Sequence, residues 1–500
     1  MSLKRNIVAN YLGQGWTALM HLAFIPLYIK YMGLEAYGLI GIYIILQAVL
    51  TLLDMGMTPT LNREMARYTA GARTLQSIRE LLFSLELLCS GLALVIAVSV
   101  WTFSSWFAEH WLRTVHLPLQ TVSDALAIMG LVAALRFIES IYRGAILGLQ
   151  THVWLNAVNA ALATARGLGA VGILIWVSPS ITAFFVWQGF ISLISVIILA
   201  IRVHHALRVA SKPVKFSILE LSNVWNFARG MIATTFLSLL LTQVDKILLS
   251  RILSLENFGT YMLAAAVAGA LMLIVAPLAQ GYYPRFTELV AQRNEPSLIA
   301  AYHQASQFMA VMVAPISLLL IFQSETVLIL WTTDEALARS SAPLVALLAL
   351  GTAFLGLMNI PYMLQLAYGW SIFAAKVNAV IVIVQIPVLY WSTLNYGAIG
   401  AAWVWVGITC SYIFVVVQLM HKKLLPKEKW KWYWQDNFLP IFSSCFTGLI
   451  LSFVKPVNFD AASNFVWLIF CWSLMFLAAF LAASNLRFFA LRKFNSWRTR

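Results

Sequence analysis

The chain has 500 residues, of which 61% are hydrophobic and only 10% are charged. This composition, with a mean hydropathy of +0.83, excludes an ordinary soluble domain. The formal net charge is +14, but no basic arm or nucleic-acid motif accompanies it. We therefore expect the basic residues to set the membrane topology and to attract anionic headgroups, and we do not expect nucleic-acid binding.

Long apolar stretches follow one another with short connections, and each is long enough to cross a bilayer as a helix. Because the apolar runs are continuous and lack the alternation of a barrel strand, we predict an all-α polytopic membrane protein. Its fourteen predicted spans are approximately 7–30, 37–60, 80–103, 123–148, 153–177, 182–202, 224–250, 258–283, 303–323, 341–366, 373–393, 398–420, 438–455 and 464–486.

The first stretch begins with Lys4 and Arg5, as a signal peptide does. Polar residues interrupt its apolar run and no small-residue cleavage site follows, so we predict an uncleaved span. If both termini are cytoplasmic, most of the 33 Lys and Arg residues lie in inner segments. The outer segments then hold only Lys30, Arg113, Arg251, Arg339 and Lys455. This asymmetry predicts a multi-pass protein with both termini in the cytoplasm.

Short motifs recur between the two halves of the chain in the same order. Leu34–Gly38 (LEAYG) returns as Leu255–Gly259 (LENFG), 221 residues later. Two further matches are Val158–Ala160 with Val377–Ala379, and Val186–Gly189 with Val404–Gly407. Ordered matches at a nearly constant offset predict a duplicated bundle, and paired membrane bundles commonly hold a substrate site. We predict an N-terminal six-helix lobe (1–215), a C-terminal six-helix lobe (216–421), and a basic linker with two more helices and a basic cytoplasmic tail (422–500).

The chain offers little for covalent or cofactor chemistry. Its four cysteines lie in separate spans without a CxxC motif, so we expect neither a metal site nor a disulfide framework. The short connections leave no room for a soluble catalytic domain, and no phosphate-binding GxxxxGK[ST] loop is present. We therefore expect a protein that is not an enzyme and needs no cofactor.

Three charged residues of the fourth span form the clearest candidate site. Arg136 and Arg143 are separated by about 20° around a helix, and Glu139 lies about 60° away from Arg136. Charges inside spans usually face a polar interior, and arginine supplies forked donors to phosphate. This face is predicted to line a cavity for an anionic headgroup. The alternative is a local Arg–Glu pair, with Arg143 reaching the membrane surface.

Other polar residues inside spans extend this prediction. Arg166 is expected either to line the cavity or to pair with Glu139 across the turn between spans four and five. Arg229 is a candidate for substrate contact or for a position at the membrane boundary. On span one, Asn10, Gln14, Thr17 and His21 are spaced by four, three and four residues. They share one helix face, so we predict that Gln14 and His21 line the same cavity.

Asp245 is the candidate ion-coupling residue. A carboxylate inside a span can exchange a proton or bind a cation. The alternative is a salt bridge from Asp245 to Lys246 or to a neighbouring helix. Near the predicted inner end of span two, Asp54 is expected to cap a helix or to pair with nearby arginines.

Several of these residues belong to motifs that resemble a known superfamily. The chain is similar to the polysaccharide transporters of the multidrug/oligosaccharidyl-lipid/polysaccharide exporter superfamily, and especially to its O-antigen (Wzx-type) flippases. The resemblance extends over residues 1–420. It rests on Asp54-Met55-Gly56 followed by Asn62-Arg63-Glu64, Gln243–Leu249 (QVDKILL), Phe258–Tyr261 (FGTY) and Pro284-Arg285-Phe286.

The resemblance implies a flippase of the bacterial inner membrane. Such a protein moves undecaprenyl-pyrophosphate-linked repeat units of O-antigen or exopolysaccharide by alternating access between two lobes. A cationic cavity is typical of the family, and its counterpart here comprises Arg136, Arg143, Arg166 and Arg229. Relatives that flip peptidoglycan precursor have arginines in the first span, whereas this chain has Gln14 and His21. As partners we expect the lipid-linked oligosaccharide and membrane lipids, with a polysaccharide polymerase and a chain-length regulator as further candidates.

Three other functions remain as alternatives. A multidrug/cation antiporter shares the expected fold, although a net-positive cavity suits lipophilic cations poorly. A membrane-embedded polymerase is expected to carry a long outer loop with polar catalytic residues, and the outer segments here are short. A scaffold for polysaccharide assembly is the third. The sequence does not predict the glycan, the oligomeric state, or whether transport is coupled to a proton, to sodium or to neither.

Overall fold

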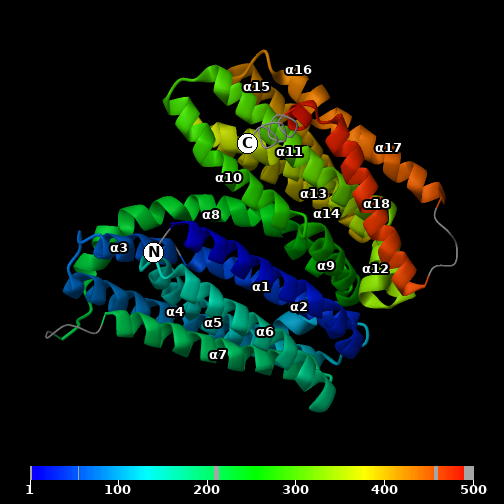
Figure 1. Cartoon of the computed structure of the whole chain (residues 1–500). Coiled ribbons are helices and arrows are strands. Elements are labelled where there is room, and N and C mark those ends of the chain that lie inside the picture. The colour runs from blue at the N-terminus through cyan, green and yellow to red at the C-terminus, as the bar shows by residue number, and fades with distance from the viewer. Residues whose placement is uncertain (1–2, 55, 208–212, 455–459, 489–500) are drawn as a thin grey trace. The chain divides into compact units, whose positions relative to one another are not determined.

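The computed structural model describes residues 3–54, 56–207, 213–454 and 460–488, with side chains omitted for 3–8 and 223–234. Every element in these ranges is a helix (Figure 1), which confirms the predicted all-α fold. The chain forms two compact units, Met1–Gly259 and Thr260–Arg500. The lobes predicted from the repeat are a division of the sequence, and their boundaries stay a prediction.

Unit 1 is a bundle of long helices. Helix α5 packs against α4 and α7, α1 packs against α6, and α8 packs against α2, as Figure 1 shows. The elements are α1 (Leu3–Met32), α2 (Leu34–Leu53), α3 (Met57–Thr69), α4 (Leu75–His110), α5 (Leu119–Gly148), α6 (His152–Trp176), α7 (Ile181–Ala206), α8 (Ile218–Ile252) and the start of α9 (Leu255–Gly269).

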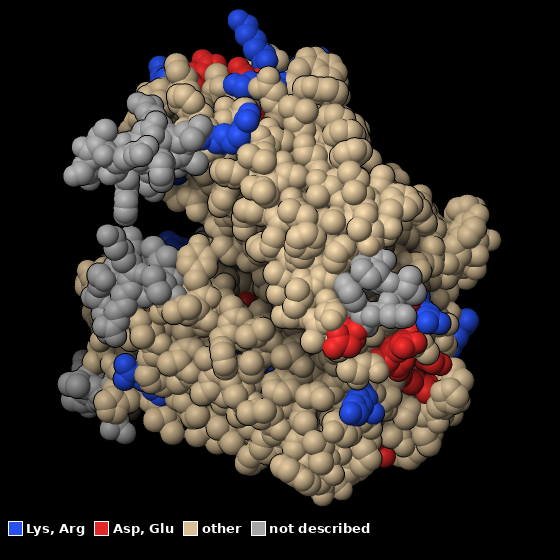
Figure 2. Space-filling view, turned by 45° about the vertical axis from the view of Figure 1, so that its right-hand side comes forward, with Lys and Arg blue, Asp and Glu red and all other residues tan. Residues whose placement is uncertain are grey.

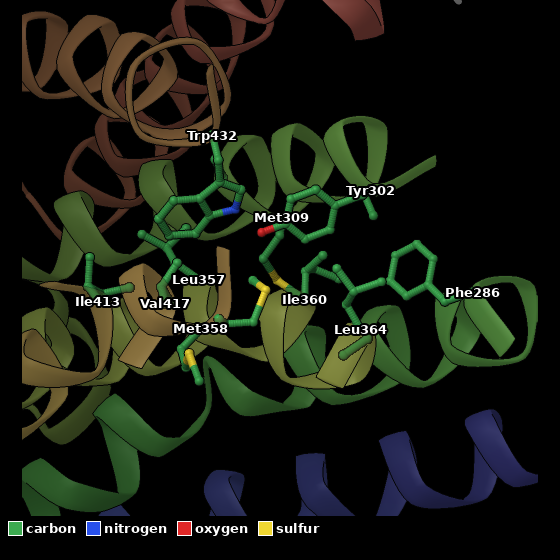
Figure 3. Packing of buried hydrophobic residues seen from close by; sticks show 14 of the residues in the cluster. Phe286, Tyr302, Met309, Leu357, Met358, Ile360, Leu364, Ile413, Val417 and Trp432 are labelled. Atoms are coloured by element: carbon green, nitrogen blue, oxygen red, sulfur yellow. The ribbon is translucent and has the colours of Figure 1, made fainter. Parts of the chain in front are cut away.

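Unit 2 is built around α11 and α13, which pack on each other. Figure 3 shows part of its core, where Phe286, Tyr302, Met309 and Leu364 come together from three helices. Its remaining elements are α10 (Met272–Ala291), α11 (Glu295–Phe322), α12 (Ser324–Thr332), α13 (Glu335–Ala367), α14 (Ser371–Ser411), η1 (Tyr412–Val416), α15 (Val417–Leu424), α16 (Lys429–Lys431), η2 (Trp432–Phe438), α17 (Leu439–Val454) and α18 (Ala461–Ala482).

The helices agree with the predicted membrane spans. In the described residues, 11 helical stretches are long and apolar enough to cross a bilayer. One of them, Ser371–Leu424, covers two predicted spans, which meet at Gly397 where φ is +59°. Predicted spans one and seven correspond to α1 and α8. On the face shown in Figure 2, charged residues are sparse across the broad surface, as expected for a protein surrounded by lipid.

Local sequence signals explain where several helices begin. The side chain of Thr74 accepts a hydrogen bond from Ser77 N at the start of α4, and Ser180 accepts one from Ala183 N at the start of α7. Asp334 caps α13 in the same way. Each cap satisfies a backbone donor that has no partner within its own helix. Together with the apolar runs, these residues allow most of the helices and their order to be predicted from the sequence.

One expected surface tryptophan is buried. Trp430, Trp432 and Trp434 lie among the lysines of the basic linker, and this pattern predicts that all three anchor the protein at the inner membrane surface. Trp430 and Trp434 are indeed 74% and 59% exposed. Trp432 is only 1% exposed, and its Nε1 donates a hydrogen bond to Ser306 Oγ at 3.1 Å. The anchoring role predicted for Trp432 is therefore wrong, because η2 turns this indole into the core of unit 2 (Figure 3).

Unit 2 also contains a buried polar network that the sequence did not predict. The two ring nitrogens of His303 contact Asp436 Oδ2 and Glu428 Oε2, the latter at 2.8 Å. Gln307 donates to Asp436 Oδ1 at 3.0 Å and accepts from the backbone N–H of Asn485. These bonds join α11, η2 and the segment after α18. They satisfy polar groups whose burial would otherwise be costly.

The two copies of the repeated motif pack against each other. A Cβ atom on Gly38 would overlap with the carbonyl oxygen of Leu255, and a Cβ atom on Gly259 would overlap with that of Leu34. Glycine is therefore required in both copies because only it permits this close approach of two backbones. Beside this contact, Glu35 accepts three backbone hydrogen bonds, from Val115, His116 and Leu117.

Replacing Gly38 or Gly259 with alanine should therefore destabilise the protein. Each added methyl group meets backbone atoms that cannot turn aside, and we expect a cost of about 1–3 kcal/mol, typical of overpacking. The measurement is the melting temperature of the purified protein. Gly269→Ala is the matched control, because a Cβ there meets nothing within 4 Å. Equal melting temperatures for Gly259→Ala and Gly269→Ala would contradict the close packing.

Candidate functional site

A cavity of about 540 Å³ lies inside unit 1, between α1, α2, α5, α6 and α7. Its aromatic lining is Phe24, Tyr28, Tyr43 and Phe184. Amide, hydroxyl, imidazole and charged side chains make up the polar lining, which consists of Gln14, Thr17, His21, Gln47, Arg136, Glu139, Arg143, Asn156, Asn159, Arg166 and Gln188. We call this space the arginine cavity. It brings together six of the seven predicted substrate-binding residues, from α1, α5 and α6.

One carboxylate in the arginine cavity is shared by two guanidinium groups. Glu139 Oε1 lies 2.5 Å from Arg143 Nη2, and Glu139 Oε2 lies 3.4 Å from Arg166 Nη2. The Glu139 side chain is 3% exposed, whereas that of Arg143 is 40% exposed. The pairing of Glu139 with Arg166, which the sequence left open, is present. Glu139 also pairs with Arg143, the arginine that the alternative interpretation placed at the membrane surface. These two pairings fix two arginine side chains on the cavity wall.

The third arginine is not neutralised. Among the described residues, no carboxylate oxygen lies within 4.0 Å of a nitrogen of Arg136, and Arg136 Nε is buried without a hydrogen-bond partner. Arg166 Nε is also buried without a hydrogen-bond partner. Buried donors without partners are unfavourable, and a ligand that accepts hydrogen bonds would satisfy them. With three arginines against one glutamate, the cavity has the charge and the free donors to bind an anion.

The polar face of α1 lies on this cavity, as its spacing predicted. Gln14, Thr17 and His21 line the space directly. Asn10 accepts a hydrogen bond of 2.6 Å from Asn156 Nδ2, which holds α1 to α6 at the edge of the cavity. Amide and imidazole groups next to the arginines can donate to a ligand or accept from it.

The two remaining predicted site residues are on α8. Arg229 belongs to α8, but its side chain is outside the described part of the structure. Asp245 is also on α8, 16% exposed, with its Oδ1 3.4 Å from Lys246 Nζ. Asp245 does not line the arginine cavity, and its pair with Lys246 is the alternative that the sequence left open.

Sequence reasoning missed several cavity residues. Gln47 donates to Tyr43 OH at 2.7 Å, and Asn159 and Gln188 face the same space from α6 and α7. Their signal was available, since each is an amide in an otherwise apolar span. Neutral amides are common enough in spans that only their convergence around Arg136 in three dimensions distinguishes them.

Comparisons with known proteins agree with this architecture. Residues 3–290 match the family described as "Polysaccharide biosynthesis protein". A "Putative O-antigen transporter" of Shigella flexneri is 21% identical over 407 residues, covering 81% of this chain and 94% of that protein.

Two solved structures share the fold at low sequence identity. The lipid II flippase MurJ, in an inward closed conformation, has a TM-score of 0.69 at 13% identity and covers 95% of this chain and 97% of its own. An inward-facing multidrug resistance MATE family transporter of the MOP superfamily has a TM-score of 0.64 at 13% identity, covering 82% and 96%. The family match extends over more than half of the sequence and includes every residue of the arginine cavity. This multi-pass membrane protein therefore belongs to the polysaccharide biosynthesis protein family and has the fold of MurJ and of the MATE transporters.

Proposed function

We propose that the protein is a flippase for undecaprenyl-pyrophosphate-linked repeat units of O-antigen or exopolysaccharide. The observation that carries the proposal is Arg136, a cation without a partner carboxylate in the described structure, facing a cavity that holds two further arginines. A pyrophosphate group has the charge and the acceptor oxygens that these guanidinium groups lack. Membership in a polysaccharide biosynthesis family supports a glycan as the attached cargo.

The arginine cavity suits the physical problem that such a substrate poses. Pyrophosphate and sugars lose their hydration in hydrocarbon at a prohibitive cost unless other polar groups replace the water. Here guanidinium, amide and hydroxyl groups replace it, and the aromatic rings of Tyr28 and Tyr43 offer surfaces for sugar rings. The lipid tail remains in the bilayer while the headgroup passes, so the chemistry is noncovalent throughout.

The proposal includes a location and an orientation. Lys and Arg residues gather in the connections that are inner if both termini are cytoplasmic. We therefore place the protein in the bacterial inner membrane, where it would move its cargo from the cytoplasmic to the periplasmic leaflet. A polysaccharide polymerase and a chain-length regulator are the proposed later partners, because a flipped repeat unit must be polymerised.

Transport would be driven by an ion gradient acting on Asp245. If Asp245 is the coupling group, Asp245→Asn should leave ligand binding intact but abolish the acceleration of flipping by a proton or sodium gradient, because the amide cannot ionise. Flipping in proteoliposomes with and without each gradient measures this effect. Asp124→Asn is the control, since this carboxylate on α5 is exposed and hydrogen-bonded to Gln120. Normal gradient dependence in Asp245→Asn would remove Asp245 from the coupling step.

A cation antiporter is the second candidate, because a MATE transporter shares the fold. The excess positive charge of the arginine cavity opposes a cationic cargo. The deciding experiment uses wild-type proteoliposomes that contain either a fluorescent undecaprenyl-pyrophosphate oligosaccharide or a lipophilic cation. Flipping of the first without movement of the second supports the proposed function. Movement of the cation alone would establish the antiporter.

A further inference from the structure

Two more cavities of unit 1 continue from the arginine cavity. One, of about 450 Å³, shares Arg136, Glu139 and Arg143 with it and lies beside α2, α3 and α5. The next, of about 300 Å³, shares Thr51 and Thr235 with the second and runs between α2 and α8. We call these two cavities the hydroxyl track, because their lining includes six hydroxyl side chains, those of Thr51, Thr58, Ser140, Thr235, Ser238 and Thr242.

The hydroxyl track differs from the arginine cavity in charge. Beyond the shared arginines, none of the residues that line it is Lys, Arg or His. Thr235, Ser238 and Thr242 are spaced by three and four residues, so their side chains form one stripe along α8. Thr51 of α2 lines both cavities with Thr235. Thr51 and Thr242 donate their hydroxyl protons to Ala48 O and Ser238 O, so their oxygens are left to accept hydrogen bonds from the hydroxyl groups of a sugar.

A carboxylate of the track disfavours a second anionic group there. Asp54 accepts hydrogen bonds from Thr58 N at 3.2 Å and from Thr58 Oγ1 at 2.7 Å. Thr58 Oγ1 in turn lies 3.2 Å from Ser140 Oγ, which ties this carboxylate to the wall formed by α5. Because like charges repel, an anionic ligand is favoured at the arginines and disfavoured beside Asp54. The helix cap predicted for Asp54 thus also shapes the charge of the track.

We infer that the hydroxyl track binds the uncharged sugar residues that follow the pyrophosphate. This inference rests on the proposed function, in which Arg136 and its neighbours hold the pyrophosphate. When the pyrophosphate is bound at these arginines, the sugars attached to it lie either in the arginine cavity or in the hydroxyl track, which shares Arg136 and Arg143 with that cavity. The track offers hydroxyl partners along its length, and its two arginines, both at its beginning, are balanced by Glu139 and Asp54. It therefore matches a neutral glycan better than a second phosphate.

The test removes hydroxyl groups without changing side-chain volume greatly. The double variant Thr51→Val/Thr235→Val is compared with wild type in nanodiscs, using undecaprenyl pyrophosphate with and without a neutral trisaccharide. We expect about tenfold weaker binding of the sugar-bearing lipid, from the loss of two hydrogen bonds. Binding of the sugar-free lipid should not change. Thr102→Val is the matched control, because its hydroxyl donates to Val98 O on α4, outside all three cavities.

The outcomes separate this inference from the proposed function. Wild-type affinity of the double variant for both lipids, or an equal loss for both, would overturn the sugar subsite. If Arg136→Gln still weakens the binding of both lipids in that case, the proposed function stands. Failure of the wild-type protein to bind either lipid would instead remove the proposed function. Should the double variant not fold, as judged by its melting temperature, Ser238→Ala/Thr242→Val tests the same stripe, and unchanged preference for the sugar would then overturn the inference.

Discussion

Replacing Arg136 with glutamine is expected to lower the rate of flipping by about 10- to 100-fold, because hydrogen bonds to charged groups contribute roughly 1.5–3 kcal/mol. Glutamine keeps some of the length and polarity of the side chain but removes the charge and the fork. The loss should appear in the flipping of undecaprenyl-pyrophosphate oligosaccharide in proteoliposomes, at equal protein insertion. It should be smaller for Arg143→Gln, because Arg143 is already paired with Glu139.

An arginine of unit 1 outside the arginine cavity, Arg202, serves as the control for this experiment. Arg202 on α7 lies over the ring of Trp154, 5.4 Å from its centroid, and does not line the arginine cavity. Arg202→Gln removes the same charge from the same unit and should flip at close to the wild-type rate. Equal rates for Arg136→Gln and Arg202→Gln would show that the charge at position 136 does not act on the substrate.

Replacing Glu139 with glutamine is expected to destabilise unit 1 by about 3 kcal/mol, the lower end of the effect of breaking a buried pair. The cause is the loss of the one carboxylate that Arg143 and Arg166 share, which leaves two cations together on the cavity wall. The melting temperature should fall accordingly. Inorganic pyrophosphate should raise it more in this variant than in wild type, because the ligand would then take the place of the carboxylate.

An exposed ion pair provides the comparison for Glu139. Glu325 Oε1 lies 3.2 Å from Arg339 Nε, and the two side chains are 50% and 68% exposed. Exposed pairs contribute about 0–1 kcal/mol, so Glu325→Gln should change the melting temperature little and show no extra response to pyrophosphate. If Glu139→Gln behaves in the same way, the carboxylate of Glu139 does not hold the two arginines on the cavity wall.

The helices were predictable because membrane spans depend on local composition. Apolar runs, helix caps such as Asp334 and the break at Gly397 are all properties of neighbouring residues. The face shared by Arg136, Glu139 and Arg143 was equally local, since it requires only the period of one helix. The stripe with Gln14 and His21 on α1 followed from the same rule.

Features that depend on contacts between distant segments could not be predicted. Trp432 was expected at the membrane surface, yet its partner Ser306 is 126 residues away. His303 meets Asp436 over 133 residues, and no pattern near either residue indicates that they pair. The repeat revealed Gly38 and Gly259 as equivalent positions, but not that the two motifs contact each other.

The proposed function depends on the binding of the pyrophosphate of a lipid-linked oligosaccharide in the arginine cavity. The most direct measurement is equilibrium binding of undecaprenyl-pyrophosphate trisaccharide to the wild-type protein in nanodiscs, with inorganic pyrophosphate and the free trisaccharide as competitors. We predict that pyrophosphate displaces the lipid from the wild-type protein, and that Arg136→Gln binds both more weakly. The opposite result has two parts: pyrophosphate does not displace the lipid, and Arg136→Gln binds the lipid with wild-type affinity. That result would contradict binding at the arginines.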